Sequence, residues 1–288
     1  MLKKRYNTRN MIILSIAAFA FAMCILALIN GRVQLPRTQL TAIVIAVAGV
    51  IVFAALSLTV GRDVTITDVP SDYPPEDITP AQAGCLQDGQ VGKREFISSF
   101  YYLAQKGYIL IEEYELQKFR IVRRNNPDHE SRHMRILFEA LFQGADDAVT
   151  ISDAAERLRT SYAEFNKAVI KSITSKKNRE IAEMTGRVNG FHSSLTENSA
   201  QKYDELTQKD SGYMEKILPY AYAFAVTSKL PSKFENTDVS VPEWYKPYGV
   251  SEGSSLDVVI YNAMLRNLRM QLEEEVLKGI REFPVINR

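Results

Sequence analysis

Residues 11–30 read MIILSIAAFAFAMCILALIN, and residues 40–60 read LTAIVIAVAGVIVFAALSLTV. Neither run contains a charged side chain, and each is close to the roughly 20 apolar residues with which a helix crosses a bilayer. A helix also satisfies its own backbone hydrogen bonds in the absence of water. The sequence therefore predicts a transmembrane hairpin over residues 1–60, with spans at about 11–30 and 40–60, and a soluble region after it.

The flanks of the first span indicate its orientation. Four basic residues and no acidic residue precede it, namely Lys3, Lys4, Arg5 and Arg9. Positive charge beside a first span holds that flank in the cytoplasm. We therefore expect a multi-pass protein of the cell membrane with two spans and with both termini in the cytoplasm. A cleaved signal peptide is the alternative, but the apolar run is long and a second span follows it.

The soluble region is acidic. The chain has 35 basic and 34 acidic side chains, and six of the basic ones but none of the acidic ones lie in residues 1–60. The remaining 29 basic and 34 acidic side chains give residues 61–288 a net charge of −5. Such a domain is poorly suited to neutralising phosphates, so nucleic acid is an unexpected partner. Cys24 and Cys85 are too few for a disulfide framework.

Prolines and glycines mark the predicted boundaries of the elements after the second span. Residues 61–79 contain three prolines among polar residues, which predicts an extended linker. Thr79-Pro80 is typical of a capped helix start, and Lys93–Lys106 has the apolar spacing of a second helix that ends at Gly107. Tyr108–Glu113 and Lys118–Arg123 alternate as two strands of a hairpin.

Two helices followed by a hairpin is the element order of a winged-helix unit, which we place at residues 80–127. Its recognition helix would be Lys93–Lys106, with Glu95, Ser98 and Ser99 among the exposed positions. These positions form a mixed set, whereas a surface that follows phosphates would concentrate basic residues.

The remaining residues are predicted to be mostly helical. Residues 128–250 form a helical domain, in which Arg135–Phe142, Ser152–Leu158 and Tyr162–Ile173 are candidates for the helices of a second winged-helix-like unit. Residues 251–288 read as an amphipathic C-terminal helix that packs back on the domain or forms a homo-oligomer. The predicted fold class is a membrane-anchored α+β protein: a transmembrane hairpin, then a mostly helical soluble region.

His129-Glu130-Ser131-Arg132-His133 matches H-E-x-x-H, in which two histidines bind zinc and the glutamate acts as general base. Arg132 would place a cation beside the metal, and the polar residues before His129 indicate an exposed helix start with Asp128 as N-cap. We therefore favour a polar helix start over a zinc hydrolase with His129 and His133 as ligands. With no phosphate loop or nucleophile elbow, we expect no enzyme, no cofactor and no metal.

Two further groups are candidates for an interaction surface. The first is a basic cluster made of Lys167, Lys171, Lys176, Lys177 and Arg179. It reads as a solvated helix face, as a contact with anionic lipid headgroups, or as a nucleic-acid contact. The second is Trp244-Tyr245, which either fills the core or forms an aromatic groove for a partner.

Four short stretches carry a family resemblance: Thr79–Gly84, Leu103–Ile109, Glu215–Ala223 and Pro242–Tyr245. In this order they resemble the cytosolic region of the YciQ-like predicted membrane proteins (DUF2207), a bacterial family of unknown function, over roughly residues 60–250. Such proteins carry an extracytoplasmic β-rich domain before their spans, and we expect this chain to lack it. The resemblance implies no catalytic residue.

Two functions from different classes follow. The first is an uncharacterised integral membrane protein that presents a cytosolic protein-interaction module to an unknown protein partner. The alternative is a membrane-tethered regulator that binds nucleic acid through the basic cluster. A zinc hydrolase is a distant third.

Overall fold

The computed structural model describes residues 49, 65–144, 147–234, 239–250, 255–256, 258–280 and 283–284. The chain forms two compact units, Met1–Val64 and Thr65–Arg288. The two predicted spans, apart from Gly49, lie outside the described residues. Among the helices that the structure describes, none has both the length and the apolar character to cross a membrane.

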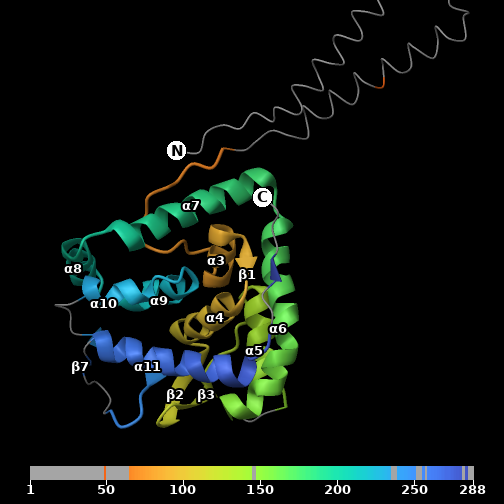
Figure 1. Ribbon diagram of the computed structural model, residues 1–288, viewed down its shortest axis with the longest axis vertical. Coiled ribbons are helices and arrows are strands. Elements are labelled where there is room, and N and C mark those ends of the chain that lie inside the picture. Colours follow the sequence, from red (N-terminus) through yellow and green to blue (C-terminus); the bar gives the residue numbers. More distant parts are fainter. Residues whose placement is uncertain are drawn as a thin grey trace, which may run out of the picture. The chain divides into compact units, whose positions relative to one another are not determined.

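The second unit is built around two helices, α3 (Pro80–Asp88) and α4 (Lys93–Gln105). Thr79 caps α3 in a reciprocal capping box: its Oγ1 accepts from the Gln82 backbone N–H at 3.3 Å, and the Gln82 side chain accepts from the Thr79 N–H at 2.9 Å. α4 is buried on every side from Glu95 to Ala104 and contacts α3, α5, α6, α9 and β2 (Figure 1).

Gly107 ends α4 as the sequence predicts. Its φ of +76° is a left-handed conformation that glycine adopts without steric cost. The N–H of Tyr108 then donates to the carbonyl of Leu103 at 2.9 Å, which satisfies a carbonyl of the last turn. This reversal leads the chain directly from α4 into the first strand of the sheet.

A four-stranded mixed sheet packs against the helices in the order β4-β3-β2-β6. The strands are β2 (Ile109–Glu115), β3 (Lys118–Arg123), β4 (Ala148–Thr150) and β6 (Tyr245–Lys246). β2 and β3 form the predicted antiparallel hairpin, and β6 lies parallel to β2 with Tyr245 opposite Ile111. The short strand between the two first helices, β1 (Gln90–Val91), pairs instead with β8 (Phe283–Pro284).

The second half is helical, as predicted, but its helices differ from the expected ones. The helices are α5 (Arg132–Phe142), α6 (Ile151–Thr174), α7 (Asn178–Glu197), α8 (Ala200–Lys209) and α9 (Tyr213–Ala223). The two helices expected at Ser152–Leu158 and Tyr162–Ile173 are one helix, α6, because no glycine or proline interrupts residues 159–161. The break between α8 and α9 lies at Asp210–Gly212, and Pro219 lies inside α9.

Short elements lead to the C-terminal helix. They are a 3₁₀ turn (Thr227–Lys229), α10 (Leu230–Lys233), β5 (Val239–Ser240) and β7 (Ser255–Leu256), followed by α11 (Val258–Gln271) and a π-helical turn, η2 (Leu272–Val276). Leu265, Leu268, Leu272 and Val276 of the predicted apolar stripe are buried within the same chain. The α+β class is therefore confirmed for the second unit, and its C-terminal helix packs on the domain.

Candidate functional site

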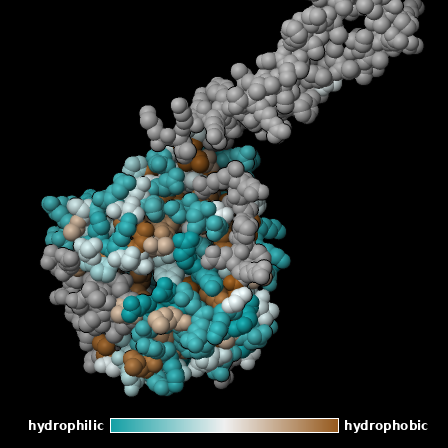
Figure 2. Space-filling model, viewed as in Figure 1, coloured by the Kyte–Doolittle hydropathy of each residue, from teal (hydrophilic) through white to brown (hydrophobic). Residues whose placement is uncertain are grey.

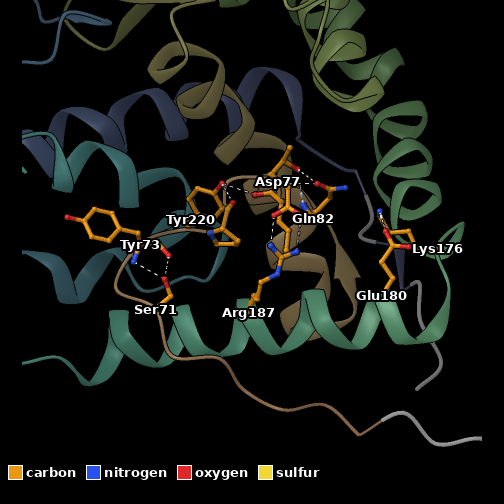
Figure 3. Close-up of polar contacts among 11 residues, drawn as sticks. Ser71, Tyr73, Asp77, Gln82, Lys176, Glu180, Arg187 and Tyr220 are labelled. Atoms are coloured by element: carbon orange, nitrogen blue, oxygen red, sulfur yellow. Dashed lines mark hydrogen bonds and ion pairs between the residues drawn. The ribbon is translucent and has the colours of Figure 1, made fainter.

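The segment Thr65–Ile78, here called the strap, contains no helix or strand; its first part runs along α7, and bends and turns follow from Asp72 to Ile78 (Figure 3). The N–H of Val69 donates to the carbonyl of Gly186 at 3.0 Å. A Cβ atom on Gly186 would lie 2.1 Å from the Thr67 carbonyl oxygen, and one on Gly190 would lie 1.8 Å from the Val69 carbonyl oxygen. The two glycines are thus what lets the strap backbone approach the helix so closely.

Polar side chains hold the strap along its whole length. Asp77 receives two hydrogen bonds from the Arg187 guanidinium at 2.6 and 2.9 Å, and these bonds lower the pKa of the Asp77 carboxyl. Asp72 accepts from the Asn198 side chain at 2.9 Å, and the Tyr220 hydroxyl donates to the Ile78 carbonyl at 2.7 Å. Residues 65–79 of the predicted linker contain no helix, and hydrogen bonds from Asp68 onward fix them to the domain.

The residue that follows the strap, Thr79, contacts His133 of the H-E-x-x-H motif. Helix α5 begins at Arg132 with Ser131 as N-cap, so Asp128 is not the cap and His129 lies in an exposed turn before the helix. His133 is fully buried, and its Nε2 lies 2.8 Å from the Thr79 Oγ1 and 3.1 Å from the Ser131 Oγ. Glu130 accepts from the Tyr108 hydroxyl at 3.1 Å.

The three chemically active residues of the motif therefore lie in different environments: His129 is exposed, Glu130 bonds to Tyr108, and His133 is buried. The described residues contain no group of three or more His, Cys, Asp or Glu side chains able to hold a metal ion. Burial lowers the pKa of His133 to about 3, so its ring is neutral at physiological pH. His133 instead links the first turn of α5 to the cap of α3, with the Phe165 ring against its edge.

The predicted recognition helix is not on the surface. Glu95, Ser98 and Ser99, expected to be exposed, are at most 1% exposed. The hydroxyls of Ser98 and Ser99 donate to the Glu95 carbonyl at 2.9 and 2.8 Å, so these polar residues are satisfied within their own helix. The expectation failed because serine can be buried at low cost when its hydroxyl bonds to the preceding turn.

Glu95 is a buried carboxyl beside the backbone of α3. Its Oε2 accepts from the Gly92 N–H at 2.8 Å, while its Oε1 lies within van der Waals distance of Gly84. Burial raises the pKa of Glu95 to about 7, although the Gly92 hydrogen bond opposes this rise. Sequence reasoning did not find this residue, since a glutamate in the first turn of a helix is ordinarily a solvated capping residue.

The basic cluster lies at the end of α6 and the start of α7. Lys167, Lys171 and Lys177 are exposed. Lys176 is paired with Glu180, and Arg179 is paired with Glu183 at 2.9 Å, each one helical turn along α7. Two of the five cations are therefore already matched by carboxylates.

Trp244 and Tyr245 are not available as contact residues in this structure. They are 8% and 2% exposed, and the Trp244 Nε1 donates to the Glu215 Oε2 at 3.0 Å. The carbonyl of Trp244 also accepts from the Ile111 N–H at 2.9 Å, so this segment forms the edge of the sheet. These contacts correspond to the core interpretation of the sequence, in which the aromatic pair fills the domain.

Exposed apolar side chains lie instead on the β2–β3 hairpin and on two segments that contact it, the one after β6 and α11. We call Tyr114, Leu116, Tyr248 and Met270 the hairpin-end patch; they are 40%, 67%, 53% and 50% exposed. Tyr248 follows β6, which runs parallel to β2 toward the tip, and Met270 precedes Gln271, whose Oε1 accepts from the Phe119 N–H at 3.0 Å. Hydrophobic side chains are visible at this end in Figure 2.

The hairpin tip has a fixed conformation. Gln117 adopts a φ of +61°, which is rare for a residue with a side chain. The buried Glu113 carboxylate holds this turn by accepting from the Gln117 N–H at 2.8 Å, and it also lies 3.5 Å from the Tyr245 hydroxyl. Two residues of the patch, Tyr114 and Leu116, are therefore held on an ordered turn. No sequence motif marks it, because its members come from three separate segments.

Residues 70–180 match the family model described as the C-terminal domain of the predicted membrane proteins DUF2207. The match begins within the strap and ends at the start of α7. The family resemblance seen in the sequence is confirmed for these residues, and the family description supports membrane association. No curated protein and no solved structure matches the chain.

Proposed function

We propose that this protein, whose residues 70–180 match the DUF2207 C-terminal domain, is a membrane-anchored module that binds a protein partner through its hairpin-end patch. The observation that carries the proposal is the position of the exposed apolar side chains. Of six large exposed hydrophobic residues among those described, four are in this patch and the other two, Ile66 and Val69, are in the strap. A gathered and exposed apolar group is typical of interaction sites.

The strap supports the anchoring part of this proposal. It continues directly from the predicted second span, and its hydrogen bonds to α7 make it part of the domain instead of a free tether. The basic start of the chain favours the cytoplasm as the location of the domain and of both termini.

The buried α4 favours protein binding over the nucleic-acid alternative. We interpret α3, α4 and the β2–β3 hairpin as a winged-helix-like scaffold whose second helix holds the domain together. A nucleic-acid contact would have to use the basic cluster, in which two of the five cations are already paired with glutamates. Contact of these cations with anionic lipid is compatible with the anchored arrangement. A zinc hydrolase would need His133 to leave its buried contacts.

Site-specific photo-crosslinking tests the proposed surface. A benzophenone amino acid is placed at Leu116 or at Tyr248 of the full chain in its native membrane, and at exposed Lys177 as the matched control. We expect both patch positions to capture the same protein and the control position not to capture it. The L116D variant should abolish capture from position 248, because it places a charge in the apolar contact.

Two results would contradict the proposal. One is capture of different sets of proteins from the two patch positions, or of none. The other is a salt-sensitive complex of the purified chain with duplex DNA that is lost on charge reversal at Lys171 and Lys177, which would favour the regulator.

A further inference from the structure

A pocket of about 420 Å³ lies between α4, α9 and α11, away from the hairpin-end patch. Its volume is in the range of about 300–1,000 Å³ that is typical of small-molecule sites. The side chains that decide its character are Tyr101, Leu218, Tyr222, Ser228, Arg266 and Arg269. We call it the α11 pocket.

Charge distinguishes the α11 pocket from two other pockets of similar size. The pocket between Arg123 and Arg135, about 430 Å³, is balanced by Asp128 and Glu139. A third pocket, about 360 Å³, has three glutamates against Arg157. In the α11 pocket both charged lining residues are arginines, and no aspartate or glutamate is among the described lining residues.

One of the two arginines has unused hydrogen-bonding capacity. The Nε of Arg269 is buried and has no hydrogen-bond partner among the described residues. The Nε is closed off from solvent, so a ligand in the pocket would meet the rest of the Arg269 guanidinium, which lies beside the Tyr222 hydroxyl. Arg266 is exposed and lies one turn earlier on α11, three residues before Arg269, so both guanidinium groups project from the same side of the helix.

Aromatic rings form the opposite wall. The ring centroids of Tyr101 and Tyr222 are 5.5 Å apart in an edge-to-face arrangement, and the Tyr101 hydroxyl donates to the Leu265 carbonyl at 2.8 Å. Burial raises the pKa of Tyr222, and the Arg269 charge opposes this rise. The phenol therefore lies near the guanidinium, at the boundary between the apolar wall and the charged wall.

We propose that the α11 pocket binds a small amphiphilic anion, a carboxylate or phosphate on an aromatic or branched apolar body. Arg266 and Arg269 hold the anionic group through charge-assisted hydrogen bonds, which guanidinium groups form with carboxylates and phosphates in a planar, forked geometry. Tyr101, Tyr222 and Leu218 cover the apolar body. Because the ligand contacts α4, α9 and α11 together, its binding stabilises the packing of the C-terminal helix.

Isothermal titration tests this proposal with the full chain in nanodiscs of zwitterionic lipid, corrected for partition into empty discs. The probe is 4-phenylbutyrate; 4-phenylbutanol has the same body without the charge, and inorganic phosphate is an anion without the body. We expect 4-phenylbutyrate to bind with an affinity about tenfold or more above that of either comparison compound.

Two variants and a matched control locate the site. R266Q/R269Q should weaken 4-phenylbutyrate binding by about tenfold or more, because it removes both charges. S228Y keeps both arginines but fills the pocket, so it should also abolish binding. Loss of binding in this second variant would show that the effect of R266Q/R269Q is not due to misfolding. R135Q removes an exposed arginine of the neutral pocket and should leave binding unchanged.

Any of three results would overturn the proposal: no binding of 4-phenylbutyrate to the unchanged protein, equal affinity for the acid and the alcohol, or binding that survives in both R266Q/R269Q and S228Y. Stronger binding of inorganic phosphate than of 4-phenylbutyrate would also contradict the proposal, because it would mean that the ligand needs no apolar body. None of these measurements depends on the hairpin-end patch.

Discussion

Glu95 and His133 are two buried ionisable residues whose pKa values move in opposite directions. Burial raises the pKa of Glu95 from 4.5 to about 7 and lowers that of His133 from 6.5 to about 3. The folded domain therefore prefers both groups in their neutral forms. Each preference makes the free energy of unfolding depend on pH, since the unfolded chain keeps the ordinary values.

The two contributions have opposite signs. Between pH 4.5 and 7 folded Glu95 holds a proton that the unfolded chain has released, so stability falls as pH rises through this window. Between pH 6.5 and 3 the unfolded chain protonates His133 while the folded domain does not, so stability falls as pH decreases. From pH 4.5 to 6.5 the two slopes cancel.

Single variants should separate the two contributions. Of these two contributions, H133N keeps that of Glu95, which should raise stability by about 3 kcal/mol as pH falls from 7 to 4.5. E95Q keeps that of His133, which should lower stability by about 3 kcal/mol as pH decreases from 6.5 to 4.5. Urea unfolding is followed through Trp244, which is buried and the single tryptophan of the chain. Parallel pH profiles in both variants would contradict the assignment.

Gly190 is a third residue whose role can be tested by a single substitution. Alanine in place of a helical glycine ordinarily stabilises a helix by about 0.5–1 kcal/mol. G190A should instead destabilise the domain by about 1–3 kcal/mol, because its Cβ would overlap the Val69 carbonyl oxygen of the strap. The measurement is the urea midpoint, with E183A on the exposed face of α7 as the control. A stabilised G190A protein would mean that the strap does not lie on α7.

Among the elements, α9 contains a proline whose missing N–H has an identifiable consequence. Pro219 lies inside the helix and cannot donate to the carbonyl of Glu215, four residues earlier. The Gln105 side chain donates to that carbonyl instead, at 2.5 Å. The proline therefore does not break α9, and it creates a link between α9 and the end of α4.

A double-mutant cycle tests this link. Q105L should cost about 1 kcal/mol by leaving the Glu215 carbonyl without its donor. In the P219A background the cost should nearly vanish, since the restored backbone N–H supplies the bond within the helix. The coupling is read from four urea unfolding curves. An equal cost of Q105L in both backgrounds would show that the carbonyl does not require the side chain.

Sequence patterns correctly predicted those element boundaries that are determined by residues close to them in the chain. Thr79-Pro80, Gly107 and the alternating strands act within a few residues, and the structure has the helix start, the helix end and the hairpin at these positions. The tolerance of Pro219 inside α9 could not be predicted from local sequence, because the compensating donor, Gln105, comes from another helix. The strap could have been suspected from Gly186 and Gly190, one turn apart on α7, but its partner segment is more than a hundred residues away.

At the scale of the whole molecule, burial depends on which elements surround each helix. α4 has the composition of an amphipathic surface helix, yet it is central because α3, α5, α6 and α9 all pack around it. The sequence could not reveal this, since three of these four helices follow the hairpin. The structure buries Trp244 and pairs two cations of the basic cluster with glutamates. We therefore place the candidate sites at the hairpin-end patch and the α11 pocket instead of at these sequence-predicted residues.

The C-terminal helix provides the last prediction, because its apolar stripe was expected either to pack on the domain or to pair with another chain. Leu268 is fully buried within its own chain, whereas Met270, two residues later, is 50% exposed. L268A should therefore cost about 2–5 kcal/mol through the cavity it leaves, and M270A should change stability by less than about 0.5 kcal/mol. Stability is read from Trp244 fluorescence in urea, and mass photometry of the nanodisc-embedded chain reports its oligomeric state. Loss of stability without a change of mass is the expected result for L268A. A lower mass with unchanged stability would instead mean that the helix joins two copies of the chain.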